Sequence, residues 1–131
     1  MLNIEPTTTY SHVINGIVMD VDSKDLFRLI QREIGYDLVP MLVADWEEAI
    51  SENPSIKMEI AYTFIVPNEL RNGIDYTQPK SYPLKEYLHA IQKGSAVFGH
   101  QFLDFWNATT YLGNGTTTVK HWNEQMSCNA Q

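Results

Sequence analysis

Two acidic residues, Asp20 and Asp22, are the best-spaced candidates for chemistry in this sequence, because they follow an apolar run at 17–19 and precede a segment with helical periodicity. Side chains two residues apart on a strand point to the same side, so the pair could hold a hard cation, which prefers oxygen ligands. The position also suits a helix cap, in which Asp22 or Ser23 accepts a hydrogen bond from a free amide of the first turn. We favour capping for Asp22 and an exposed strand end for Asp20, and keep the pair as the alternative metal site.

The string IVMDVD, residues 17–22, resembles the first motif of the haloacid-dehalogenase-type phosphatases. In that family one carboxylate attacks the phosphate and the other serves as acid or base beside Mg²⁺, so the resemblance implies a metal-dependent phosphatase built on Asp20 and Asp22. Ser23 and Lys24 stand where the family has Thr followed by Val or Leu. The family's later motifs, a Ser or Thr, a Lys and paired Asp residues in a parallel sheet, are not recognisable here, which favours the cap.

Other residues that carry chemistry are scattered along the chain. The histidines have no metal-ligand spacing with one another or with the single cysteine, and there is no phosphate-cradling glycine loop. We therefore expect no cofactor and lean against an enzyme, while a site assembled from distant His and Asp residues stays open. The histidines are His12, His89, His100 and His121, and Asp104 and Glu86 are candidate partners for one of them. The cysteine, Cys128, lies in a polar tail, which disfavours a positioned nucleophile.

The negative charge is concentrated in the first half of the chain. Of the net charge of −7, all arises from residues 1–60, which hold eleven acidic and four basic residues, whereas residues 61–131 hold five of each. Between residues 33 and 56 there is no Lys or Arg. A concentrated acidic surface attracts basic proteins and repels acidic ones, and it would also repel the phosphates of DNA or RNA.

The acidic segment coincides with a helix that we predict over 41–51. On such a helix Asp45, Glu48 and Glu52 lie within about 60° of one another, beside an apolar side that carries Trp46, and aromatic residues are favoured interface anchors. A solvated helix face is the plain alternative, because two like charges about 9 Å apart in water repel by only about 0.5 kcal/mol. The candidate partner-binding residues are Asp45, Trp46, Glu47, Glu48 and Glu52, with Glu33 and Asp37 as a lesser rim.

The secondary structure that must position these residues follows from apolar spacing and turn residues. Asn15-Gly16 between β-forming residues predicts a tight hairpin, and Pro40 suits the first turn of the helix that follows it. Residues 96–106 fit a helix better than a strand, although Gly99 weakens that pattern. In chain order the expected elements are a hairpin of 8–14 and 17–21, helices at 23–34 and 41–51, a central strand at 56–66, a helix at 83–93, and a hairpin formed by NATTYL and TTTVKHW.

The pattern predicts a single domain, residues 1–131, of the α+β class. We expect a small antiparallel or mixed sheet, made from the N-terminal hairpin, the strand 56–66 and the C-terminal hairpin, packed against three to four helices. No segment is apolar for long enough to cross a bilayer, the first residues lack signal-peptide character, and one cysteine cannot form an internal disulfide. We therefore expect a cytoplasmic protein with no membrane contact.

The function that fits best is a small acidic binding protein that inhibits or regulates a basic, nucleic-acid-handling partner. Toxin-immunity proteins and phage anti-defence proteins are similar in size and charge. Two alternatives stay open. One is a small metal-dependent or ligand-binding enzyme domain that uses Asp20 and Asp22. The other is an assembly subunit, a homo-oligomer in the simplest case, joined through the aromatic residues that crowd the last third: Phe98, Phe102, Phe105, Trp106, Tyr111 and Trp122.

Overall fold

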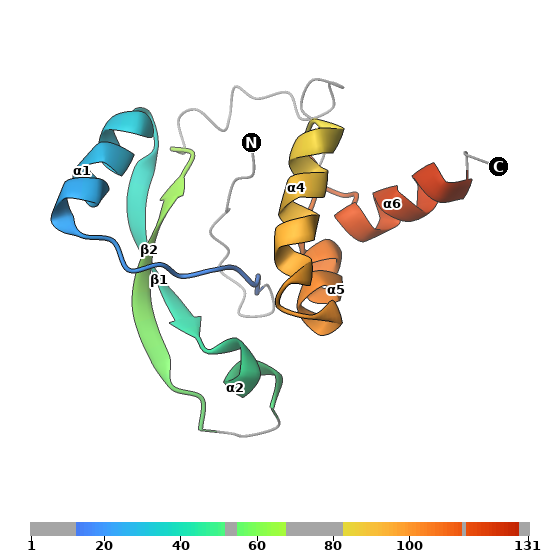
Figure 1. Ribbon diagram of the computed structural model, residues 1–131, viewed down its shortest axis with the longest axis horizontal. Helices are drawn as coiled ribbons and strands as arrows, with labels where there is room; N and C mark the ends of the chain where they lie inside the picture. Colours follow the sequence, from blue (N-terminus) through green and yellow to red (C-terminus); the bar gives the residue numbers. More distant parts are fainter. Residues whose placement is uncertain (1–12, 52–54, 68–82, 114, 129–131) are drawn as a thin grey trace. The chain divides into compact units, whose positions relative to one another are not determined.

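The computed structural model describes residues 13–51, 55–67, 83–113 and 115–128 (Figure 1). Within them lie a two-stranded antiparallel sheet and five helices, so the predicted α+β class is confirmed. The chain divides into two compact units. We call the described residues 17–51 and 55–67 the sheet unit, and residues 13–16, 83–113 and 115–128 the helical unit. Whether both belong to one domain stays a prediction.

The first helix, α1 (Ser23–Arg32), confirms the prediction for 23–34. The Asp22 carboxylate accepts a hydrogen bond from the Asp25 amide at 2.8 Å, which satisfies a first-turn N–H that has no partner inside the helix. One turn on, Arg28 pairs with Asp25 at 3.2 Å. The chain leaves the helix through Gly35, whose φ of 95° is accessible to glycine at little cost.

The helix predicted over 41–51 is wrong for most of its length. Residues Asp37–Ala44 form strand β1, and only Trp46–Ile50 are helical, as α2. Strand β1 pairs antiparallel with β2 (Met58–Ile65), the strand predicted at 56–66, and Leu42 lies directly opposite Ile60. The predicted central position of this strand is wrong within the described residues, where β1 is its one neighbour. Pro40 is compatible with a strand at the edge of a sheet as well as with a first helical turn, and pairing with β2 decides between the two.

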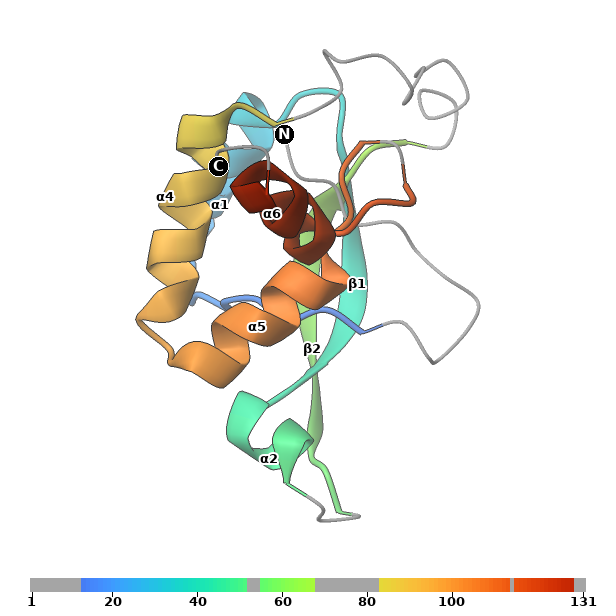
Figure 2. The ribbon, with the colours of Figure 1, turned by 90° about the vertical axis from the view of Figure 1, so that its right-hand side faces the viewer.

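The helical unit contains α4 (Lys85–Ala96), α5 (His100–Thr109) and α6 (Val119–Cys128) (Figure 2). Helix α4 confirms the prediction for 83–93, although it continues past Gly94 to Ala96. Helix α5 follows Gly99, whose φ is 98°. Helix α5 packs against both α4 and α6. One buried cluster of the unit consists of Leu88, Trp106, Leu112 and Val119, with Ile91 and Trp122 packed against it, and Phe102 on α5 is buried as well.

The predicted C-terminal hairpin is wrong beyond a single bridge between Tyr111 and Thr118. The Leu112 amide donates to the Thr117 carbonyl at 2.8 Å and closes a short turn, after which α6 begins. The Thr118 hydroxyl accepts a hydrogen bond from the amide of His121 at 3.2 Å and so caps the helix. Helical spacing then places Val119 and Trp122 on the core, which outweighs the β-propensity of the threonines.

The N-terminal hairpin is also wrong where it can be checked, because residues 13–21 form no strand. Residues 8–12 lie outside the described residues. The side chain of Asn15 does not occupy a hairpin turn but donates a hydrogen bond from Nδ2 to the carbonyl of Phe102 on α5, at 2.7 Å. This contact ties the segment 13–16 to the helical unit.

Candidate functional site

The predicted acidic surface centres on α2, where Asp45 has a structural as well as an electrostatic role. Its Oδ1 accepts hydrogen bonds from the amides of Glu47 at 2.8 Å and Glu48 at 3.2 Å, which caps the helix. The carboxylates of all three residues remain in solvent-exposed positions, while Trp46 is half-buried. Two acidic residues in the first turn also interact favourably with the positive end of the helix dipole, so the local fold tolerates this concentration of negative charge.

Lys57, just before β2, adds one cation to this surface, and Glu59 on β2 adds one further carboxylate. The Glu48 carboxylate accepts a hydrogen bond from the backbone amide of Lys57 at 3.3 Å, and the Lys57 ammonium pairs with Glu59 at 2.6 Å. The hydrogen bond from Lys57 lowers the pKa of Glu59. The hydrogen bond and the charge of Glu59, and to a lesser degree the charge of Glu48, raise the pKa of Lys57. We call Asp45, Glu47, Glu48 and Glu59 the α2 acidic group.

Sequence reasoning missed the involvement of Lys57 and Glu59. Lys57 is the first cation after the acidic segment, but in the sequence it stands nine residues from Glu48. It reaches Glu48 because β2 returns antiparallel alongside β1. A prediction of strand pairing that placed Ala44 opposite Met58 would have brought Lys57 close to Glu48. In the part of the chain that the structure describes, one ammonium accompanies these four carboxylates, so the α2 acidic group carries a net negative charge there.

The lesser rim, Glu33 and Asp37, lies away from α2. Asp37 begins β1 and Asp45 follows its last residue, so eight residue steps along a strand separate them, about 26 Å. Glu33 pairs with Arg32 at 3.0 Å, which compensates its charge. The structure therefore brings Asp45, Glu47 and Glu48 together and leaves Glu33 and Asp37 at the opposite end of the strand. Glu52 lies outside the described residues.

The candidate metal ligands Asp20 and Asp22 are placed differently from each other. Asp22 is the cap of α1, as predicted, and its Oδ1 is engaged by the helix. Asp20 is exposed beside α1. Over the described ranges, no three His, Cys, Asp or Glu side chains come close enough together to hold a metal ion. Because its carboxylate already serves the helix, Asp22 is a poor ligand for a cation.

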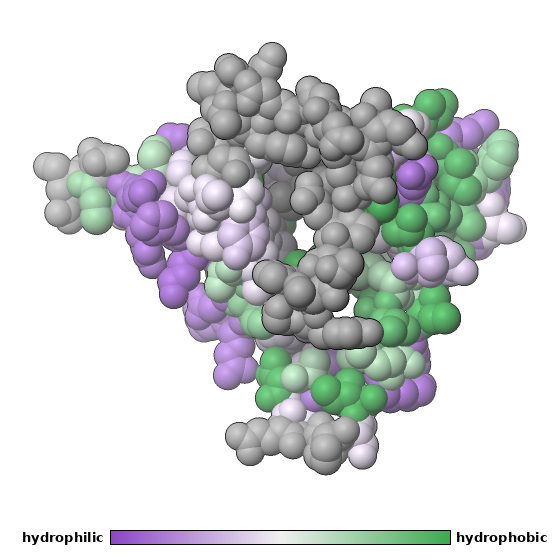
Figure 3. All heavy atoms as spheres, turned by 180° about the vertical axis from the view of Figure 1, so that it is seen from behind, coloured by the Kyte–Doolittle hydropathy of each residue, from purple (hydrophilic) through white to green (hydrophobic). Residues whose placement is uncertain are grey.

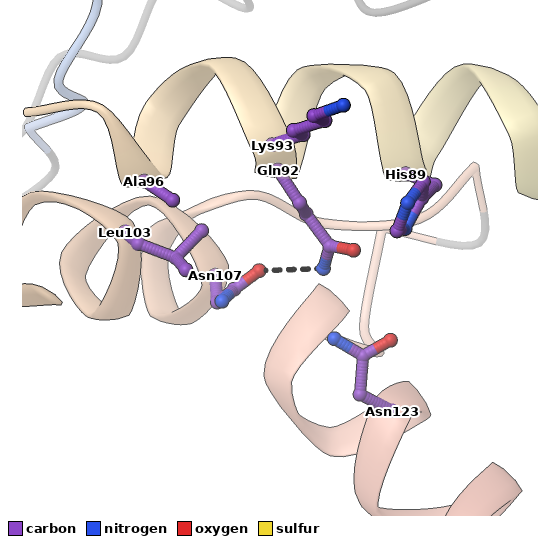
Figure 4. A pocket seen from close by; sticks show the side chains of 7 residues that line it. All are labelled: His89, Gln92, Lys93, Ala96, Leu103, Asn107 and Asn123. Atoms are coloured by element: carbon purple, nitrogen blue, oxygen red, sulfur yellow. Dashed lines mark hydrogen bonds between the residues drawn. The ribbon is translucent and has the colours of Figure 1, made fainter.

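The helical unit has an open depression of about 590 Å³ between its three helices (Figure 4). Gln92 from α4 donates a hydrogen bond to Asn107 from α5 at 2.9 Å across its floor, and Asn123 contributes a further amide from α6. His89 and Lys93 line the α4 side. These groups can form hydrogen bonds with a small polar molecule, but the lining contains neither a carboxylate nor a thiol nucleophile. The sequence could not indicate it, because its residues come from three helices.

The C-terminal aromatic residues divide between the core and the surface. Phe102 and Trp106 are buried in the helical unit, as core filling requires. Phe98 and Tyr111 are about half exposed, and the Phe98 ring packs on Phe102 with 5.2 Å between ring centroids. The aromatic content of this segment is thus mostly explained by packing.

Comparison with known proteins finds no family model, no curated protein and no solved structure that matches this chain. Across the part of the chain that the structure describes, every helix is too short or too polar to cross a bilayer.

Proposed function

We propose that this protein binds a basic protein partner through the α2 acidic group and thereby inhibits or regulates it. The observation that supports the proposal is the grouping of Glu47 and Glu48 on one short helix with Asp45 at its N-cap, and Lys57 lies beside them. The proposal includes a cytoplasmic location and a partner that handles nucleic acid, because such partners present basic surfaces to phosphates.

The electrostatics of such a surface favour fast and selective encounter rather than great affinity. Clustered charge raises the association rate with an oppositely charged partner, and the effect weakens as salt screens it. Trp46 is half-buried at the start of the same helix and supplies an apolar contact beside the charges. An acidic surface of this kind can occupy a partner's nucleic-acid-binding surface, because it offers carboxylates where phosphates would bind.

The test compares the natural chain with the triple variant Asp45→Asn, Glu47→Gln, Glu48→Gln. Asparagine is as good a helix cap as aspartate, so the charge is removed while the cap is retained. A control variant removes the same amount of charge elsewhere: Asp20→Asn, Glu86→Gln, Glu124→Gln. These three residues are exposed and lie outside the α2 acidic group.

Each chain is immobilised and exposed to soluble extract of the cells in which it is expressed, at about 0.05 M and about 0.5 M NaCl. A retained basic protein is then purified, and its dissociation constant is measured by calorimetry at both salt concentrations. We expect the natural chain and the control to bind it at low salt, and the triple variant to bind at least about tenfold more weakly with a shallower salt dependence. Equal affinity of the triple variant and the natural chain would reject the α2 acidic group as the binding surface.

A further inference from the structure

Among the described residues, neither edge of the β1–β2 ribbon has a partner strand, and the two edges differ in character. Pro40 lies directly opposite Tyr62. Directly opposite residues in an antiparallel pair either exchange two backbone hydrogen bonds or none, and proline, which has no N–H, is tolerated where its nitrogen faces away from the partner strand. The Pro40–Tyr62 pair is therefore of the kind that exchanges no backbone hydrogen bonds, and the Pro40 nitrogen faces away from β2. The outer edge of β1 lacks an N–H donor at its centre and is a poor template for a further strand.

The same register makes the outer edge of β2 a good template. Because the Pro40–Tyr62 pair exchanges no backbone hydrogen bonds, the N–H and C=O groups of Tyr62 point away from β1. The same holds for every second residue from it, namely Met58, Ile60 and Phe64. Strand β2 contains no proline, and none of the described segments pairs with this edge. The side chains of these four residues share one face of the ribbon, where Ile60 is 68% and Tyr62 67% exposed. Figure 3 shows apolar side chains over the sheet unit.

We infer that the outer edge of β2 pairs with β2 of a second copy of this chain, antiparallel about a two-fold axis. With Ala61 on the axis, Ile60 faces Tyr62 of the second copy and Met58 faces its Phe64, which adds about eight backbone hydrogen bonds. The result is a four-stranded sheet, whereas a two-stranded ribbon alone is only marginally stable in water. A shared edge also suits the two-fold symmetry of most homodimers.

The charges next to the outer edge of β2 do not oppose pairing with a second copy, even though each chain carries a net charge of −7. The charged side chains next to this edge, Lys57 and Glu59, neutralise each other within one chain. In the Ala61-centred register, Glu59 lies opposite Thr63 of the second copy rather than opposite another carboxylate, so the pairing creates no direct like-charge contact. The contact is small, so we expect a weak dimer with a dissociation constant on the order of 10–100 µM.

Dimerisation and the binding of a basic partner should respond to salt in opposite directions. Two chains with the same net charge repel each other at long range, and salt screens that repulsion, so dimerisation should strengthen as salt increases. Binding of a basic partner to the α2 acidic group should instead weaken as salt increases, because salt screens the attraction between opposite charges. Each result can therefore stand or fail without the other.

The test is sedimentation velocity of the full chain from about 1 to about 300 µM, a range that brackets the expected dissociation constant, at low and high salt. Two variants are compared, Ile60→Glu on β2 and Leu42→Glu on β1, and both introduce the same charge. Leu42 lies directly opposite Ile60 on the same face of the ribbon and is 64% exposed, so it serves as the matched control. We expect the natural chain to dimerise, Ile60→Glu to weaken the dimer at least about tenfold because each interface contains the substitution twice, and Leu42→Glu to leave it nearly unchanged.

A natural chain that stays monomeric throughout would overturn the inference, and so would equal weakening by both variants, which would instead indicate packing through the apolar face. If Ile60→Glu does not fold, amide hydrogen exchange of the natural chain gives the answer. At high concentration, protection should increase at Met58, Ile60, Tyr62 and Phe64 and change little at Ala61, whose amide already faces β1. Unchanged protection at the four outward amides would overturn the pairing.

Discussion

Replacing Leu88 with alanine should destabilise the helical unit far more than the same replacement at Leu84, one turn earlier. Leu88 is 2% exposed and belongs to the cluster with Trp106, Leu112 and Val119, whereas Leu84 is 75% exposed. The two leucines differ in burial but belong to the same stretch of chain, so the pair isolates the contribution of the core.

The magnitude follows from the atoms removed. Leucine to alanine removes three carbon atoms, about 2.4 kcal/mol of transfer free energy at about 0.8 kcal/mol each. The cavity left beside Trp106 and Val119 adds to this, for a total of about 3 kcal/mol. At Leu84 about a quarter of the transfer term applies, roughly 0.6 kcal/mol, and no enclosed cavity forms.

The assay is urea unfolding followed by tryptophan fluorescence in a Trp46→Phe background. Trp106 and Trp122, the two remaining tryptophans, both lie in the helical unit and so report on it alone. With a slope of about 1.5 kcal/mol per molar urea, Leu88→Ala should lower the midpoint by about 2 M and Leu84→Ala by less than about 0.5 M. Similar losses for the two variants would refute the assignment of Leu88 to the core.

Two further predictions concern the sheet unit. Asp22→Ala should lower the free energy of unfolding by about 1 kcal/mol through loss of the α1 cap, and Asp22→Asn should restore most of it; a thermal melt in which asparagine gives no rescue would contradict the capping role. Because the pKa of Glu59 lies below its ordinary value of 4.5, its pairing with Lys57 stabilises the fold above pH 4.5 and is lost as pH falls through the lowered pKa. Lys57→Met should therefore return the pKa of Glu59 toward 4.5 in an NMR titration, and an unchanged titration curve would refute the ion pair.

Helix α1 and strand β2 could be predicted from the sequence because their information is local. The apolar spacing of 23–34, with Asp22 in front of it, specifies both the helix and its start, and the alternation of 56–66 specifies a strand. Strand β1 could not be predicted in the same way. Pro40 suits either a helix start or an edge strand, and the choice depends on β2, whose partner residues are at least 14 positions further along the chain.

The candidate site shows the same division. Composition alone located the negative charge between residues 33 and 56, because counting charges needs no coordinates. It could not show that β1 extends between Asp37 and Asp45 and so separates them, nor that Lys57 returns beside Glu48.

The sequence by itself therefore determined where the charge lies along the chain, the α+β class, and those elements whose periodicity and caps are contained within a dozen residues. Only the tertiary structure decided which carboxylates share a surface, which cation accompanies them, and which residues face each other across the ribbon. The physical reason is that strand pairing joins residues far apart in the chain, and the free energy of pairing depends on both strands at once rather than on either segment alone.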